Sequence, residues 1–517
     1  MKRVIGLLSV AIAAFAVTPA TASDSAVDVD ALYTKHCVEC HGPTRLGGIG
    51  PALIPETLKR LKPDDLALAI REGRPATQMP AFGEEIDEAG IAALVERIRT
   101  PLAEIPPWGP EEIAATREMN PDYKPADKPV FTSDPMNLFI VVETGDHHAT
   151  VLDGDTFEPL TRFPTPYVVH GGPKFTSDGR YVFFMSRDGW VMKYDIWSLQ
   201  EVGRVRGAIN SRNIALSHDG KHIALANYLP HSLVLLSTED LTLEKIIPAV
   251  GADGKSSRVS AVYQAPPRKS FILALKDLPE VWEVFYGEDP PFYGFVHDYR
   301  TEGPPKQTDP FPVRRIKLDD YLDDFFFDQA YEHLIGAARN GKNGQVVDMV
   351  IGRKVADIDL TGLPHLGSGI SWKVGDQTVM ATPHLRESSI SIIDMKTWKT
   401  IKRLETLGPG FFMRSHEKSR YAWADVFFGP NRDAMHIIDK EKLEIVKTLK
   451  PEPGRVAAHV EFDRDGSHAI VSIWEDDGAI LIYDAKTLEI VKRLPMKKPS
   501  GKYNVFNKIT FEEGTSH

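Results

Sequence analysis

Cysteine is nearly absent from this sequence: its 517 residues include only Cys37 and Cys40, which share one short motif. Two cysteines so close together leave none for a bridge between distant parts of the chain. A large protein without a disulfide framework relies on its hydrophobic core, and a chain of this length with 42% hydrophobic residues can bury one. The length predicts two or three domains.

The sequence also lacks an excess of positive charge and long apolar stretches. The formal net charge of -11 argues against nucleic acid and against an anionic membrane surface as binding partners. Beyond the first residues, no stretch is apolar over the ~20 residues that a membrane-spanning helix needs. We therefore expect neither a nucleic-acid-binding protein nor a membrane span in the mature chain.

Residues 1–22 have the three parts of a secretory signal peptide. A positive start at Met1-Lys2-Arg3 is followed by an apolar stretch over 4–17 and by Ala20-Thr21-Ala22, which has the form of a cleavage site. The alternative is an N-terminal membrane anchor, for which the apolar stretch is too short. We expect cleavage before Ser23 and a periplasmic protein.

The motif Cys37-Val38-Glu39-Cys40-His41 predicts a covalently bound haem, because Cys-x-x-Cys followed by His is typical of c-type attachment. The thiols of Cys37 and Cys40 would hold the porphyrin, and His41 would bind the iron from one face. Met79 lies downstream in a polar loop, and its thioether is the predicted ligand on the other face. The alternative is that Met79 only fills the core.

The segment around this motif resembles class I cytochromes c, which are small all-α electron-transfer domains. The resemblance extends over residues 24–105, and a predicted helix over 87–99 closes the domain. We therefore assign residues 23–105 to a cytochrome c domain that carries single electrons on a covalent haem c. Residues 106–130, which are rich in proline, are interpreted as a linker.

From residue 131 onward, short β-branched and aromatic runs alternate with turns. Three copies of one unit, over 175–182, 216–223 and 462–469, each contain an Asp-Gly pair typical of a hairpin turn. Five weaker copies complete the series, and the spacing suits the ~40–45 residues of a four-stranded propeller blade. The prediction is a mainly β fold in which residues 131–517 form an eight-bladed β-propeller, with seven blades as the alternative.

A c-type domain followed by an eight-bladed propeller resembles cytochrome cd1, the nitrite reductase whose propeller holds haem d1, and its relatives. Matching segments are spread over most of the chain. They are 167–183 with His170, 334–339, 364–369 with His365, and 501–507 with Tyr503. The resemblance implies a second tetrapyrrole, haem d1 or dihydro-haem d1, bound without a covalent link in the propeller.

One segment departs from the nitrite reductases. In those enzymes two histidines above the haem d1 iron give protons to bound nitrite, and His365 corresponds to the second of them. The first belongs to a Leu-His-Asp-Gly-Gly segment, where this chain has Leu322-Asp323-Asp324-Phe325-Phe326. The carboxylate of Asp323, ionised at neutral pH, is a poor proton donor. Nitrite reduction is therefore the alternative rather than the main interpretation.

The chain resembles more closely the NirN-type branch of this family, the dihydro-haem d1 dehydrogenases of haem d1 biosynthesis. These enzymes convert one propionate of the tetrapyrrole to an acrylate. The resemblance implies that His170 and His365 bind the substrate iron and that His459 and Tyr503 lie beside the reacting side chain. A neutral histidine, with an ordinary pKa of ~6.5, can accept the proton that this reaction releases. The electrons would leave singly through haem c.

Three arginines complete the predicted site. Haem d1 carries several carboxylates, which need cationic partners when they are partly buried. Arg187, Arg212 and Arg258 match the family positions for this role. His384 is the alternative to His365 as an iron ligand.

The resemblance also implies protein partners. These are an electron acceptor protein and the cytochrome cd1 nitrite reductase, which would receive finished haem d1. A carrier that delivers haem d1 without oxidising it is the non-enzyme alternative.

Overall fold

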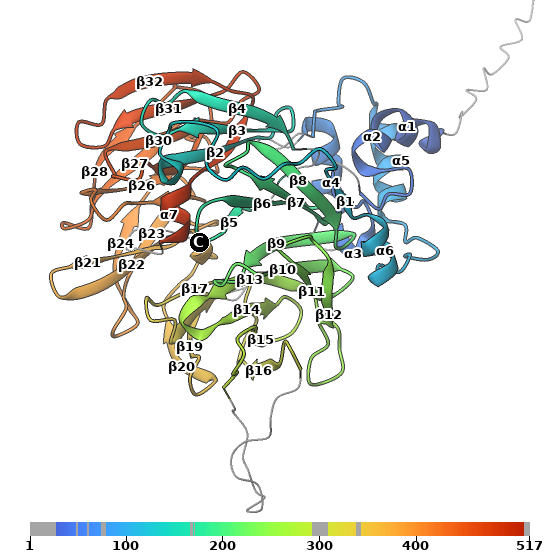
Figure 1. Ribbon diagram of the computed structural model, residues 1–517. Coiled ribbons are helices and arrows are strands. Elements are labelled where there is room, and N and C mark those ends of the chain that lie inside the picture. The colour runs from blue at the N-terminus through green and yellow to red at the C-terminus, as the bar shows by residue number, and fades with distance from the viewer. Residues whose placement is uncertain are drawn as a thin grey trace, which may run out of the picture.

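The computed structural model describes residues 27–47, 50–58, 61–73, 79–165, 169, 171–291, 309–337 and 343–510. The predicted signal peptide and His170 lie outside these residues. The N-terminal part consists of helices, and the rest of the described chain consists almost wholly of strands (Figure 1). No helix in the described ranges combines the length and the apolar character needed to cross a membrane.

The N-terminal helices form a small domain with its own core. Asp28 and Asp87 cap its first and last helices, because their carboxylates accept the otherwise unpaired N–H groups of Ala31 at 3.0 Å and Gly90 at 2.8 Å. The helices bury one apolar cluster around Tyr33, and the last of them confirms the helix predicted over 87–99. Their bounds are α1 (Val29–His36), α2 (Val38–His41), α3 (Pro55–Leu58), α4 (Pro63–Glu72) and α5 (Glu88–Arg99).

The strands of the described residues form eight antiparallel sheets, which are the blades of a propeller (Figure 1). The predicted blade number of eight is confirmed, and seven blades are excluded. The first four blades in chain order are β2 (Leu138–Glu143), β3 (His148–Asp153) and β4 (Pro159–Pro164); β5 (Lys174–Phe175), β6 (Tyr181–Met185), β7 (Trp190–Asp195) and β8 (Gln200–Arg206); β9 (Asn210–Leu216), β10 (His222–Leu229), β11 (Ser232–Ser237) and β12 (Leu243–Pro248); and β13 (Val259–Ala265), β14 (Ser270–Leu275), β15 (Glu280–Phe285) and β16 (Val313–Lys317).

The remaining blades follow the same plan. They are β17 (Asp324–Phe327), β18 (His333–Ala337), β19 (Gly344–Asp348) and β20 (Arg353–Ile358); β21 (Ile370–Val374), β22 (Gln377–Pro383), β23 (Ser389–Asp394) and β24 (Lys399–Glu405); β25 (Met413–Arg414), β26 (Tyr421–Asp425), β27 (Met435–Asp439) and β28 (Glu444–Leu449); and β29 (Ala457–Phe462), β30 (His468–Ile473), β31 (Ala479–Asp484) and β32 (Ile490–Pro495).

The last strand closes the ring. β33 (Pro499–Asn504) comes from the end of the chain but pairs with β2, where Asn504 lies opposite Phe139. The short helix α7 (Val505–Ile509) follows it and lies towards the middle of the ring in Figure 1. Because both ends of the domain share one blade, no open sheet edge is left between the first blade and the last.

One edge strand of each blade faces the centre. β5 approaches β9, β9 approaches β13, β25 approaches β29, and β29 approaches β33. We call β33, β5, β9, β13, β17, β21, β25 and β29 the inner strands. Residues far apart in the sequence meet there, because neighbouring inner strands belong to different blades.

The predicted Asp-Gly hairpins are confirmed in all three strong copies of the repeat. Gly179, Gly220 and Gly466 have φ angles of 69°, 72° and 68°, between β5 and β6, β9 and β10, and β29 and β30. This left-handed backbone costs glycine little, and a residue with a Cβ adopts it less readily.

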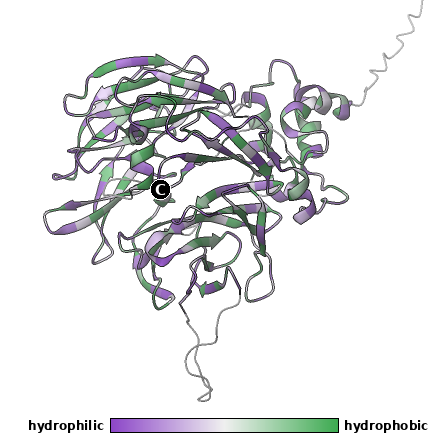
Figure 2. Cartoon of the chain, viewed as in Figure 1, coloured by the Kyte–Doolittle hydropathy of each residue, from purple (hydrophilic) through white to green (hydrophobic). Residues whose placement is uncertain are grey.

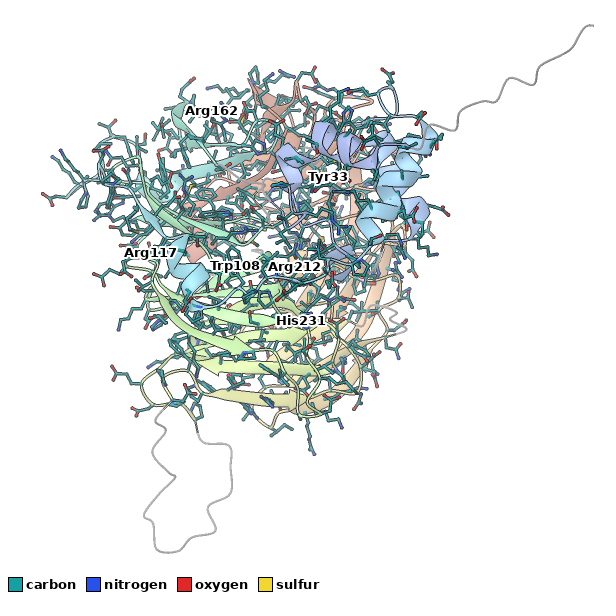
Figure 3. The ribbon with its side chains drawn as sticks, turned by 90° about the vertical axis from the view of Figure 1, so that its right-hand side faces the viewer. Tyr33, Trp108, Arg117, Arg162, Arg212 and His231 are labelled. Atoms are coloured by element: carbon teal, nitrogen blue, oxygen red, sulfur yellow. The ribbon has the colours of Figure 1, made fainter. Side chains whose placement is uncertain are left out.

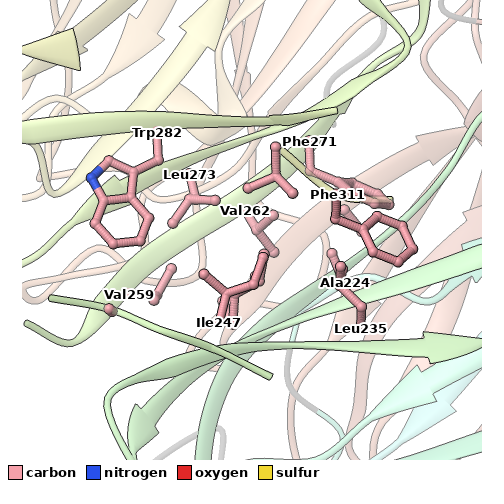
Figure 4. Close-up of a cluster of buried hydrophobic side chains, with 14 of the residues drawn as sticks. Ala224, Leu235, Ile247, Val259, Val262, Phe271, Leu273, Trp282 and Phe311 are labelled. Atoms are coloured by element: carbon pink, nitrogen blue, oxygen red, sulfur yellow. The ribbon is translucent and has the colours of Figure 1, made fainter. Parts of the chain in front are cut away.

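The core of the propeller lies between neighbouring blades. In one interface Leu235 and Ile247 pack against Val262, Phe271 and Leu273 of the next blade (Figure 4). Apolar residues run along the strands of every sheet in view, and hydrophilic residues gather in the outer loops (Figure 2). Burial of these side chains holds the blades together in place of cross-links.

The predicted linker over 106–130 is more structured than a connector. It contains α6 (Pro110–Ala115) and β1 (Glu118–Met119), and β1 adds a fifth strand to the blade of β8. Trp108 and Ile113 explain this, since both pack into the apolar cluster between the second and third blades. The free energy gained by burying these two side chains exceeds the conformational entropy that the segment loses when it becomes ordered.

Arg206 joins the helical domain to the propeller. Its guanidinium lies 4.6 Å from the ring of Trp108, which Figure 3 labels. It donates to the carbonyl oxygen of Asp188 at 2.7 Å and to that of Leu46 at 3.1 Å. The loop that follows the haem motif therefore rests on the blade that carries the predicted pocket residue Arg187.

Candidate functional site

Cys37, Cys40 and His41 lie together at the junction of α1 and α2. The two thiols are half-buried and form no disulfide. Nδ1 of His41 donates to the carbonyl oxygen of Pro51 at 2.8 Å, which leaves Nε2 for an iron ion. Burial lowers the pKa of His41, so the imidazole is neutral as a ligand must be. These residues fit a covalent haem held from one face by His41.

Two further residues shape this part of the site. Met79 is half-buried and packs against the same apolar cluster as Cys37, beyond the end of α4. A Cβ added at Gly50 would lie 2.7 Å from Cε1 of His41, so only glycine allows this approach to the ring. Cys37 and Met79 thus border one apolar cluster of the helical domain, and Cys40 and His41 follow Cys37 on α2.

A cluster of cations surrounds Tyr228 on β10, near the inner strands. Arg187, Arg258 and Lys276 lie 5.9, 5.4 and 5.2 Å from its ring. Burial alone would raise the pKa of Tyr228, but the charges of Arg212, Lys276 and Arg187 outweigh it and lower the pKa to about 8. So much positive charge in a buried place suits the carboxylates of a ligand.

The three predicted arginines differ in what they already contact. Arg258 makes two hydrogen bonds to Asp277, at 2.8 and 2.6 Å, so its charge is balanced within the protein. Burial, followed by the charge of Arg212, lowers the pKa of Arg187 to about 10. Arg187 is thus a stronger candidate than Arg258 for binding an anionic ligand, and sequence analysis missed Tyr228 beside it.

The segment that departs from the nitrite reductases is held by ion pairs and hydrogen bonds. Asp323 lies 3.1 Å from the ammonium group of Lys276. Asp324 accepts the N–H of Gly367 at 2.7 Å and the hydroxyl of Tyr263 at 3.2 Å. Since an ion pair keeps a carboxyl group ionised, Asp323 is not placed to give a proton to an anion.

His365 has the geometry of an iron ligand. It precedes the 3-10 turn η3 (Leu366–Ser368), and its Nδ1 donates to the carbonyl oxygen of Phe411 at 2.7 Å. Nε2 then carries the lone pair, and it lies 3.7 Å from a carboxylate oxygen of Asp324. Burial lowers the pKa of His365, which favours the neutral form that a metal binds.

His384, the alternative ligand, has a structural role. Its Nδ1 contacts the carbonyl oxygen of Thr361, and its Nε2 lies 2.8 Å from the hydroxyl of Ser391. Both nitrogens are therefore used inside a fully buried strand end. The alternative of His384 as the iron ligand is wrong, because neither nitrogen is available to a metal.

His459 and Tyr503 are brought together by closure of the ring. His459 lies on β29 at a β-bulge with φ of 53°, and its ring centroid is 5.2 Å from that of Tyr503 on β33. Burial, together with the charges of Lys502, Lys508 and Arg414, lowers the pKa of His459 well below its ordinary value. The imidazole is thus neutral and able to accept a proton.

Aromatic rings connect His459 to His365. The ring of His365 lies 4.3 Å from that of Phe411, Phe411 lies 4.5 Å from Phe412, and Phe412 lies 4.8 Å from His459. Gly172 borders the same region, since a Cβ added there would lie 2.8 Å from the Tyr503 ring. The predicted ligand and the predicted base therefore line one continuous apolar wall.

Sequence analysis missed several charged residues around this wall. They are buried or half-buried on inner strands, at the ends of the neighbouring strands β14 and β26, or on α7, where nothing in a single sequence distinguishes them from surface charges. They are Lys174, Lys276, Asp425, Glu461, Lys502 and Lys508.

We expect Arg414→Met to destabilise the propeller by about 3–5 kcal/mol, because it leaves the carboxylate of Glu461 buried without its ion-pair partner. Arg414 and Glu461 are 3% and 1% exposed and make hydrogen bonds of 2.9 and 3.1 Å. Urea denaturation measures the loss, and the double variant Arg414→Met/Glu461→Gln should recover part of it. A loss below about 1 kcal/mol would mean that this pair behaves like an exposed one.

Two known families match the chain. Residues 133–508 match the family described as Cytochrome D1 heme domain. Residues 24–98 match the family described as Cytochrome C oxidase, cbb3-type, subunit III.

Similar proteins cover nearly the whole chain. The Dihydro-heme d1 dehydrogenase of Pseudomonas aeruginosa is 50% identical over 94% of this chain and 95% of its own length. The Nitrite reductase of Stutzerimonas stutzeri is 26% identical over 97% of this chain and 96% of its own length. Among solved structures, Dihydro-heme d1 dehydrogenase NirN in complex with DHE has a TM-score of 0.82 and 50% identity, and the match covers 93% of this chain and 99% of that one.

Proposed function

The chain belongs to the Cytochrome D1 heme domain family, and from this premise we propose that it is a dehydrogenase that oxidises dihydro-haem d1 to haem d1. The observation that carries the proposal is the neutral His459 beside Tyr503, on the same wall as His365. A base at this place suits removal of a proton from a tetrapyrrole side chain. The 50% identity to a dehydrogenase over nearly both whole chains supports the same reaction.

The residues of the propeller bind and orient the substrate. His170 and His365 bind its iron from the two faces, which holds the macrocycle still and blocks small ligands. Arg187, Arg212 and Arg258 bind its carboxylates. His459 takes a proton from the propionate side chain, with Tyr503 beside it. Burial and the charge of Glu461 raise the pKa of Tyr503, so its hydroxyl stays protonated.

Converting a propionate to an acrylate removes two protons and two electrons. The first proton needs a base because it leaves a carbon atom, and His459 supplies that base. The second leaves a side chain that is already oxidised and therefore acidic, so it needs no strong base. A haem bound by Cys37, Cys40, His41 and Met79 supplies a one-electron acceptor at the edge of the propeller.

We expect Arg212→Met to weaken dihydro-haem d1 binding about 10–100-fold, because a hydrogen bond between charged groups is worth ~1.5–3 kcal/mol. The double variant Arg162→Met/Glu143→Gln is the matched control, because Arg162 on the outer strand β4 pairs with the buried Glu143 at 2.9 Å and the double change leaves no buried charge unpaired. Figure 3 shows the two arginines well apart. Titration followed by the visible spectrum gives both dissociation constants. If the two variants bind dihydro-haem d1 with equal dissociation constants, Arg212 does not bind the substrate.

The alternatives make different predictions for the purified protein. A nitrite reductase would retain haem d1 and release nitric oxide from nitrite with a reduced donor. A carrier would bind and transfer the tetrapyrrole without oxidising it. Our proposal predicts a protein isolated with haem c alone, no nitric oxide, and conversion of added dihydro-haem d1. Stoichiometric haem d1 in the isolated protein would favour the reductase.

The location and partners follow from the same function. The signal-peptide pattern over residues 1–22 supports a periplasmic enzyme. Its electrons then pass to an acceptor protein, and its product passes to the cytochrome cd1 nitrite reductase. Pull-down of that reductase from periplasm by the enzyme holding haem d1 tests the second partner.

A further inference from the structure

A second group of cations lies beside Tyr503. Lys508 on α7 has its ammonium nitrogen 5.4 Å from the centroid of the Tyr503 ring. Lys174 on the inner strand β5 is close enough for its charge to act on Lys508, and α7 packs against both β5 and β33. Two lysines from distant parts of the chain therefore meet near Tyr503.

The carboxylate of Glu461, which also acts on Lys508, is already bound by another cation. Arg414 makes hydrogen bonds of 2.9 and 3.1 Å to it. Burial, with the charges of Arg414 and Lys174, lowers the pKa of Lys508 well below its ordinary value, and Glu461 opposes this only in part. Burial lowers the pKa of Lys174 to about 8. The protein thus gathers cationic groups here at a cost in free energy that a bound anion would offset.

Lys502, the third lysine of this region, has a structural role. Its amino group contacts the carbonyl oxygen of His459 and lies 2.8 Å from the hydroxyl oxygen of Ser472. It is 0% exposed, so no ligand reaches it. Lys174 and Lys508 are only half-buried, so a ligand at the inner strands can reach them. The other charged or titratable side chains of the surrounding elements are Arg212, Arg414, His459, Glu461, Lys502 and Tyr503.

We propose that Lys174 and Lys508 together bind the carboxylate of the propionate that is oxidised. The inference rests on the proposed function, in which Tyr503 lies beside this side chain. The carboxylate is only two bonds beyond the first carbon atom of the propionate, so the group that binds it must lie close to Tyr503, as Lys508 does. Two ammonium groups suit the two oxygen atoms of a carboxylate.

Binding at this end holds the reacting side chain extended. The iron ligands and the cations around Tyr228 hold the macrocycle, and the two lysines hold the far end of the propionate. The C–H bonds between these points then keep one orientation next to Tyr503. Fixing a reacting group in this way contributes to the rate as well as to the affinity. Lys174 and Lys508 bind the substrate and take no proton from it.

Lys174→Met and Lys508→Met test the inference, with dihydro-haem d1 and its methyl ester as the two ligands. The ester keeps the macrocycle and has no charged carboxylate. We expect the ratio of the two dissociation constants, ester over acid, to fall about 10–100-fold in each variant, because a hydrogen bond between charged groups is lost. At saturating substrate kcat should also fall, by up to about 100-fold. Lys508→Arg should keep most of the ratio, since a guanidinium group also binds a carboxylate.

The matched control is Lys193→Met. Lys193 is also buried in the propeller, at 6% exposure, and donates to the carbonyl oxygen of Glu239 at 3.0 Å, outside the site. Its ratio and its kcat should match the native protein. A native ratio in both Lys174→Met and Lys508→Met overturns the inference, whatever happens to kcat. If the ratio falls while kcat stays native, the lysines bind a different carboxylate, and the assignment to the reacting propionate is wrong.

A measurement on the native protein covers the case in which the variants do not fold. A bound carboxylate favours the charged form of a lysine, so its pKa rises and a proton is taken up from solution. Because the pKa of Lys508 is well below its ordinary value in the free protein, we expect this uptake at neutral pH when dihydro-haem d1 binds, and none with the methyl ester. A pH indicator measures it under anaerobic conditions with haem c already reduced, so that no oxidation adds protons. Equal pH changes with the two ligands contradict the inference.

Failure of the proposed function is seen separately. If the native protein with oxidised haem c does not convert dihydro-haem d1, the proposed function fails. The ratio of dissociation constants and the proton uptake need no turnover, so they still show whether Lys174 and Lys508 bind a carboxylate.

Discussion

His459→Ala is expected to slow the oxidation of dihydro-haem d1 by about 10²–10⁴-fold, the usual contribution of a general base, while the substrate still binds. The expectation follows from a neutral imidazole that is 8% exposed and wedged between the rings of Phe412 and Tyr503. Alanine removes the proposed proton acceptor and leaves the proposed iron ligand His365 and the cationic cluster in place. Single-turnover kinetics followed by the visible spectrum measures the rate directly.

The control for this variant is His468→Ala. His468 lies on the adjacent strand β30, and its Nδ1 contacts Asp463 at 2.7 Å on the outside of the site. It should turn over at the native rate. Full activity in His459→Ala, with binding intact, would show that His459 takes no part in the chemistry.

The second large effect is expected from Cys37→Ala/Cys40→Ala. Without the two thioether bonds the haem of the helical domain is not retained, and the electrons taken from the substrate lose their outlet. Catalytic turnover with an external acceptor should fall to the rate of the substrate's uncatalysed oxidation. Binding of dihydro-haem d1 should persist, because the propeller is a separate folded part with its own cores.

Circular dichroism and a binding titration show whether the propeller of this double variant is intact. The matched control is Arg162→Met/Glu143→Gln, which changes one ion pair of the first blade and leaves the attachment motif complete. Native turnover in the double variant would show that electrons leave the propeller by a route that does not involve the helical domain.

Local rules in the sequence predicted the fold well. The haem motif needs only five consecutive residues, so its attachment residues are visible without any tertiary contact. The Asp-Gly turns repeat because each blade has to reverse its chain in the same place, as the positive φ of Gly179, Gly220 and Gly466 shows. The cap at Asp87 likewise fixed one end of a helix.

What the sequence could not predict depends on contacts between blades. Lys502 meets His459 only because β33 closes the ring beside β29. The pKa of Tyr228 is lowered by Arg187 and Lys276 of the two neighbouring blades, together with Arg212. The sequence alone allows His384 as an iron ligand, but in the structure both of its ring nitrogens make hydrogen bonds within the protein. The proline-rich segment over 106–130 suggested a linker, and burial of Trp108 turned part of it into a strand and a helix.

The most direct test of the account mixes the purified protein, with oxidised haem c, and dihydro-haem d1 in the absence of oxygen. With the protein in excess, we predict that the visible spectrum changes to that of haem d1 while the haem c bands become reduced. Because the oxidation releases two electrons and each protein carries one haem c, one tetrapyrrole is converted for every two haem c groups reduced, faster than the free tetrapyrrole is oxidised. If the tetrapyrrole stays unchanged and haem c stays oxidised, electrons do not flow from the propeller to the helical domain, and the central claim is contradicted.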